Sequence, residues 1–65
     1  MAVTDKDLMV ADNADLDAKI VELTDYVNSD AIHTLAYEDS SLLWRQLAAM
    51  QTYQGILEKR IERSE

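Results

Sequence analysis

The 65-residue sequence lacks cysteine and has a single histidine, His33, which excludes disulfide bonds and a zinc site built from several Cys or His ligands. It also lacks proline and has one glycine, Gly55, so its composition favours an all-helical chain. A domain of this size hides only about 60% of the surface of its unfolded chain and usually needs a further source of stability. We therefore expect one domain over residues 1–65 that assembles with copies of itself and holds no metal and no cofactor.

Long apolar runs are missing as well. No segment approaches the roughly 20 apolar residues that span a bilayer, and the N-terminus lacks the basic and then apolar pattern of a signal peptide. We expect a soluble cytoplasmic protein that does not bind membranes.

Basic residues are few, and the charge is unevenly distributed. The net charge is −7, and residues 1–39 hold ten of the 13 acidic residues with only Lys6 and Lys19 as bases. Residues 40–65 hold the other four bases and three acids. Because nucleic-acid binding depends on neutralising phosphates, an acidic surface argues against direct binding of nucleic acid. It is typical of a solvated face, and it can also imitate a nucleic acid.

The apolar spacing predicts two helices. A first helix at about 5–28 carries one stripe, and Thr4 is its expected N-cap; the stripe residues are Met9, Leu16, Ile20, Leu23 and Val27. Asn13 falls inside this stripe, either as a buried polar residue that sets the register or as the cap of a shorter helix. A linker at about 29–38 contains one helical turn, and a second helix at about 39–63 is capped by Asp39 or Ser40. The fold expected is an antiparallel two-helix hairpin, which would place Asp5, Asp7 and Asp12 beside Lys59, Arg60 and Arg63.

The second helix has more apolar surface than one partner helix can cover. Further apolar residues flank its central stripe, so that together they span about half of the helix circumference. The stripe consists of Leu43, Leu47, Met50, Leu57 and Ile61, with Gln54 in line between Met50 and Leu57. We expect the hairpin to form a homo-oligomer through this flank, which consists of Leu42, Ala49, Tyr53 and Ile56.

Two segments, "ADLDAKIVELTDYV" and "LLWRQLAAMQTYQGILEKRI", resemble a family of small tailed-phage proteins first annotated from a crAss-like phage. The resemblance covers about 50 of the 65 residues and has no clear counterpart for Met1 to Asn13. Gln46, Tyr53 and Arg60 are its most specific matches, because helix packing alone does not demand them. The other matching residues are Asp15, Leu16, Asp17, Lys19, Ile20, Leu23, Leu42, Leu43, Leu47, Met50, Ile56, Leu57 and Ile61. The resemblance implies a phage-encoded helical hairpin without assigned catalytic residues.

Trp44 is the first candidate for binding, because it lies outside the apolar arc, above Ala48 and Gly55. With Tyr37 and Arg45 it can stack a base or anchor a partner protein; it can also close the hairpin end by covering Ile32 and Leu35. Gly55 either allows close approach of another helix or ligand, or is simply tolerated on an exposed face.

Gln46, Tyr53 and Arg60 are seven residues apart along one edge of the second helix. Across a two-fold axis they form either a polar pocket for phosphate or carbonyl groups, or a hydrogen-bonded ladder between subunits. His33 is expected at the surface or as a cap.

By analogy of size and origin, we expect a phage anti-defence protein that acts by binding and is not an enzyme. It would sequester a host nucleotide immune signal in pockets at the subunit junctions of a homo-oligomer in the host-cell cytoplasm. The ligand-binding residues expected are Trp44, Arg45, Tyr37, Gln46, Tyr53 and Arg60. The alternative is an acidic inhibitor, acting as a nucleic-acid mimic, that binds a host protein.

Overall fold

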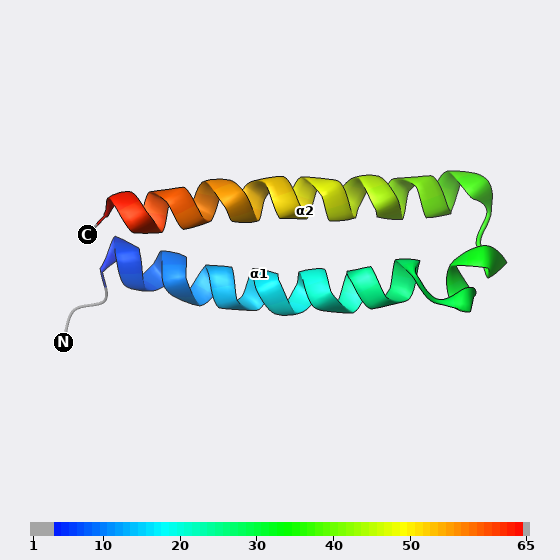
Figure 1. Cartoon of the computed structure of the whole chain (residues 1–65), viewed down its shortest axis with the longest axis horizontal. Coiled ribbons are helices and arrows are strands. Elements are labelled where there is room, and N and C mark those ends of the chain that lie inside the picture. Colours follow the sequence, from blue (N-terminus) through cyan, green and yellow to red (C-terminus); the bar gives the residue numbers. More distant parts are fainter. Residues whose placement is uncertain (1–3, 65) are drawn as a thin grey trace.

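A computed structural model describes residues 4–64 and contains three helical elements. α1 (Asp5–Val27) and α2 (Tyr37–Arg63) lie side by side and antiparallel, joined by the short 3-10 helix η1 (Asp30–Thr34). Figure 1 shows η1 at one end of the hairpin, and the start of α1 and the end of α2 at the other. The hairpin measures 48 × 19 × 13 Å. The predicted all-helical hairpin is confirmed; the ends of the predicted domain, residues 1–3 and 65, lie outside the described residues.

α1 begins where its N-cap was expected. The Thr4 hydroxyl accepts a hydrogen bond from the Asp7 backbone N–H, and the Asp7 carboxylate accepts one from the Thr4 backbone N–H, both at 3.1 Å. This reciprocal capping box satisfies two backbone donors at the positive end of the helix. Asn13 therefore lies inside α1 and caps nothing, and its Oδ1 is buried without a hydrogen-bond partner.

Short polar side chains end α1. Asn28 Nδ2 donates to the Thr24 carbonyl at 2.8 Å, and the Ser29 hydroxyl donates to the Tyr26 carbonyl at 2.6 Å. Both carbonyls also accept a backbone N–H, from Asn28 and Ser29 respectively, so the side chains add a second hydrogen bond to each at the end of the helix. η1 follows and buries Ile32 against the hairpin core.

α2 starts earlier than expected. Its N-cap is Ala36, which makes no side-chain cap bond, so the prediction that Asp39 or Ser40 caps this helix is wrong. The Ser40 hydroxyl instead donates to the Tyr37 carbonyl at 3.0 Å, inside the first turn. Glu38 and Asp39 also lie in this turn, where their charges favour the positive helix end without a capping hydrogen bond.

One apolar seam joins the helices. Its buried members come from all three elements, and Leu57 is the most completely buried at 1% exposure; the full set is Leu16, Ile20, Val27, Ile32, Leu47 and Leu57. Half-buried residues pack around them: Met9, Leu23, Leu35, Leu43, Met50 and Ile61. Both predicted stripes therefore face this seam.

The flank of α2 is left uncovered. Leu42, Tyr53 and Ile56 remain 56%, 44% and 54% exposed, and Ala49 is exposed between them. The expected excess of apolar surface on α2 is thus present in the hairpin. A Cβ added at Gly55 would meet nothing within 4 Å, so the fold of the single chain does not require glycine there. Across residues 4–64, neither long helix is apolar enough over a sufficient length to cross a membrane.

Candidate functional site

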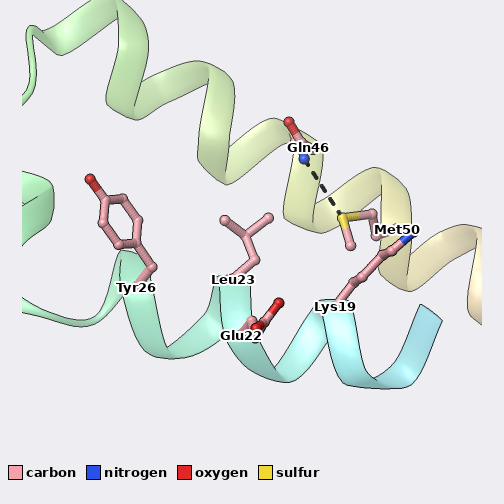
Figure 2. Close-up of a pocket in the computed structure, with 6 residues that line it drawn as sticks. All are labelled: Lys19, Glu22, Leu23, Tyr26, Gln46 and Met50. Atoms are coloured by element: carbon pink, nitrogen blue, oxygen red, sulfur yellow. Dashed lines mark hydrogen bonds between the residues drawn. The ribbon is translucent and has the colours of Figure 1, made fainter. Parts of the chain in front are cut away.

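A pocket of about 340 Å³ opens between the two helices near the middle of the hairpin. Figure 2 shows α1 and α2 side chains converging on it. Four lining residues come from α1 and two from α2: Lys19, Glu22, Leu23, Tyr26, Gln46 and Met50. We call it the interhelical pocket; its volume falls at the lower end of the range for small-molecule sites.

The interhelical pocket has an apolar base and polar edges. Leu23 and Met50 are half-buried members of the core, whereas Lys19, Tyr26 and Gln46 are exposed. Gln46 Nε2 donates to the Met50 sulfur at 4.0 Å, a weak bond that turns the amide along α2 (Figure 2). The pocket therefore combines a phenol ring and an amide with two opposite charges, the Lys19 ammonium and the Glu22 carboxylate. The ring can stack a planar ligand, and the ammonium can meet an anionic group that is held away from the carboxylate.

Trp44 lies in a second pocket, at the η1 end of the hairpin. This pocket has a volume of about 380 Å³ and is lined by Val27, Ile32, His33, Leu35, Tyr37, Ser40 and Trp44. Trp44 is 48% exposed, while Tyr37 is 85% exposed. The structure thus brings Trp44 together with the linker residues Ile32 and Leu35, as expected if Trp44 closes the end of the hairpin.

Arg60 lies at the opposite end of the hairpin, where α1 begins and α2 ends. It lines a third pocket with Asp5, Met9, Arg63 and Ser64. Of the three acids expected beside the bases of α2, Asp5 is therefore near Arg60 and Arg63. Asp7 forms the capping box, and Asp12 accepts a hydrogen bond from Tyr53.

Tyr53 links the two helices through its hydroxyl. It donates to the Asp12 carboxylate at 2.7 Å. This hydrogen bond is the main reason that the pKa of Tyr53 is raised above its usual value; partial desolvation and the Asp12 charge add to it, and the Arg60 charge opposes it. A second polar contact between the helices is Gln54 Nε2 donating to Asp17 at 3.2 Å.

The residues predicted to bind a ligand do not form one site within a single chain. Trp44 and Tyr37 lie at the η1 end, Gln46 lines the interhelical pocket, and Arg60 lies near the termini. Arg45 is exposed on α2 and lines none of these three pockets. Any common site for all of them would need more than one chain.

Of the six residues that line the interhelical pocket, only Gln46 was predicted to bind a ligand. Lys19 and Tyr26 are, with Glu22, the exposed residues that α1 contributes, and the sequence did not single them out for binding. They are seven residues apart, so they lie on one edge of α1, beside the buried stripe of Leu16, Ile20 and Val27. A signal was present in the sequence, since Lys19 is one of only two bases before residue 40. Within residues 4–64, no group of three or more His, Cys, Asp or Glu side chains is placed to hold a metal ion.

Fold and pockets together define a small helical-hairpin protein with ligand-sized pockets on its surface. The chain matches the model of the Sequestin family over residues 4–63, and it therefore belongs to the Sequestin family. This confirms the family resemblance carried by the two helical segments, and it extends that resemblance to Thr4, although no counterpart was expected before Ala14. No curated protein and no solved structure matches the chain.

The Tyr53–Asp12 hydrogen bond predicts a pH effect. Because the folded-state pKa of Tyr53 is raised, its stabilising contribution is complete below about pH 10, the usual tyrosine pKa, and is lost as pH rises through the folded pKa. Asp12→Asn should lower the pKa of Tyr53 toward the ordinary value, as followed by the NMR titration of ¹³C-labelled tyrosine rings. Asp15→Asn, an exposed acid on the same helix, is the control and should leave it unchanged. An unaltered Tyr53 titration in Asp12→Asn would show that the bond does not control this group.

The position of Trp44 predicts a structural contribution. Replacing a fully buried Trp by Ala costs about 3–5 kcal/mol; since Trp44 keeps 48% of its surface exposed, Trp44→Ala should destabilise the hairpin by about 1–2 kcal/mol in urea unfolding at fixed protein concentration. Tyr37→Ala removes a more exposed aromatic ring from the same pocket and should change stability by less than about 0.5 kcal/mol. Equal stability of Trp44→Ala and the unchanged protein would rule out that Trp44 closes the end of the hairpin.

Proposed function

We propose that this protein sequesters a small nucleotide immune signal of the host cell, as a phage anti-defence protein that acts by binding without turnover. The family name, Sequestin, suggests a sequestering function and supports the general part of this proposal. The specific part has two bases. The nucleotide ligand rests on the pocket chemistry, whereas the phage origin and the host-cell cytoplasm rest on the resemblance to small phage proteins.

The observation that carries the proposal is the composition of the interhelical pocket. Lys19 provides a positive charge for a phosphate in a chain with a net charge of −7. Tyr26, 38% exposed, offers a ring for a base, and Gln46 offers both a donor and an acceptor for a base edge. A phosphate, a base ring and a base edge can each use one of these three kinds of contact. The same groups hold a ligand but include no nucleophile paired with a base, which is why we propose binding alone.

Self-association is part of the proposed mechanism. The interhelical pocket is open, and the exposed α2 flank of Leu42, Ala49, Tyr53 and Ile56 lies along the same helix as its Gln46 wall. A further copy on this flank would enclose a bound nucleotide more fully and would bring Arg45 and Tyr53 of a second chain to the junction.

A second candidate function rests on the outer surface of α1. Leu8, Val10 and Val21 are 60%, 48% and 54% exposed among the acidic residues of this helix. An acidic surface with apolar points is suited to binding a host protein, including one that normally binds nucleic acid. Capture of a stoichiometric host protein from lysate, without any nucleotide binding, would favour this inhibitor.

Isothermal titration calorimetry against cyclic nucleotides and ADP-ribose-derived nucleotides tests the leading proposal. At least one member should bind, and Lys19→Ala and Tyr26→Ala should each weaken its affinity by about tenfold or more, because stacking alone contributes about 1–3 kcal/mol per base. Lys59→Ala removes an exposed lysine that lines none of the three pockets and is the matched control. Absence of heat from every nucleotide, with the protein folded and at its normal oligomeric state, would refute the proposal.

A further inference from the structure

One exposed flank of α2, next to the side that faces α1, carries a stripe of residues that is symmetrical in its spacing. Starting from its N-terminal end, the residues follow one another at intervals of four, three and four, and then again four, three and four: Glu38, Leu42, Arg45, Ala49, Tyr53, Ile56 and Arg60. All seven are exposed. At about 100° per residue they lie within one quarter of the helix circumference, so they form a single continuous surface. We call it the outer stripe.

The outer stripe is also symmetrical in chemistry about its central residue, Ala49. Two aliphatic side chains, Leu42 and Ile56, flank it at equal distances. Glu38 and Arg60, which have opposite charges, lie at equal distances beyond them. Arg45 and Tyr53, a cation and an aromatic ring, form the third equidistant pair, and such a pair is attractive when the cation lies over the ring.

From this symmetry we infer that the outer stripe binds the outer stripe of a second copy, with the two α2 helices antiparallel about a two-fold axis at Ala49. Leu42 then packs on Ile56 of the partner subunit, and Glu38 lies beside Arg60 of the partner subunit. Each contact occurs twice, as a two-fold interface requires. The small side chain of Ala49 at the axis allows the two helices to approach closely.

Charge selects the antiparallel arrangement over the parallel one. In a parallel pair, Glu38 would face the partner's Glu38 and Arg60 would face the partner's Arg60, and like charges on adjacent helices repel. The antiparallel pair replaces both repulsions with attractions. It also places the positive end of each α2 dipole beside the negative end of the other.

The exposed apolar area favours a second copy as the occupant. Leu42 and Ile56 are each more than half exposed in the single chain. In the proposed pair, Leu42 is covered by Ile56 of the partner subunit and the reverse, so both side chains are removed from water. The resulting pair of hairpins brings four long helices together, and it enlarges a core that has six buried hydrophobic side chains among residues 4–64. This inference rests on the self-association in the proposed function and specifies its geometry. Gln46, which lines the interhelical pocket, directly follows Arg45 of the stripe, so the pocket borders this junction.

Because the chain has no cysteine, single cysteine variants can test this arrangement directly. Ala49→Cys should form a disulfide-linked dimer under mild oxidation, since the two Ala49 positions meet at the axis. Leu42→Cys alone should not cross-link. Its proposed contact is Ile56 of the partner subunit, and positions 42 and 56 are fourteen residues apart along α2, so the two Leu42 positions lie about 21 Å from each other. Mixing Leu42→Cys with Ile56→Cys should give the mixed disulfide in high yield.

Gly55→Cys is the matched control, since Gly55 is exposed on another side of α2 and has open space around its added Cβ. Cross-linking of Leu42→Cys with itself would indicate a parallel pair and overturn the inference. Cross-linking of Gly55→Cys as fast as that of Ala49→Cys would overturn it by showing random collision. No cross-linking of Ala49→Cys would overturn it by showing that the two stripes do not meet there. These readouts do not involve nucleotides, so a cross-linked dimer that binds no nucleotide would refute the proposed function and leave this inference standing.

Discussion

The apolar seam between α1 and α2 is the contact on which the rest of the molecule depends. Leu57 and Leu47 of α2 are buried against Leu16, Ile20 and Val27 of α1. The capping box at Thr4 and the polar turn after Val27 fix where α1 begins and ends, so that its stripe aligns with this seam. Two polar links, Tyr53 to Asp12 and Gln54 to Asp17, lie at the margins of the seam and join the same two helices. The interhelical pocket lies beside this seam. Leu23 and Met50 form its base, and Lys19 and Gln46 line its exposed edges.

The same seam explains why the hairpin should not remain alone. One helix can cover only a limited arc of its neighbour, and α2 carries apolar residues beyond that arc at Leu42, Ala49 and Ile56. The proposed function and the proposed pairing both follow from this geometry. Self-association would cover the outer stripe, and the junction so formed would border a pocket that already holds a cation, a ring and an amide. Trp44 is separate from this arrangement, since it lines the pocket at the η1 end with Ile32 and Leu35.

Residue periodicity was sufficient to predict the hairpin, both stripes and the exposed flank, because helical burial repeats at fixed intervals. The cap at Thr4 was also predictable, since its bond to Asp7 is local. The start of α2 was not, because Ala36 caps it without a side-chain bond and leaves no signal in the sequence. The interhelical pocket was missed for a different reason: Lys19 and Tyr26 acquire their relation to Gln46 only through the relative rotation of two helices. Sequence spacing also grouped Trp44 with Arg60, although they lie at opposite ends of the hairpin.

The central claim is that α2 presents an apolar surface that only another copy of the chain covers. Sedimentation equilibrium across a wide range of protein concentrations, combined with thermal unfolding of the same samples, tests it most directly. The account predicts a mass that is a multiple of the chain mass, and a melting temperature that rises with concentration because assembly stabilises the folded chain. A stable protein with the mass of a single chain, and with a melting temperature independent of concentration, would contradict it.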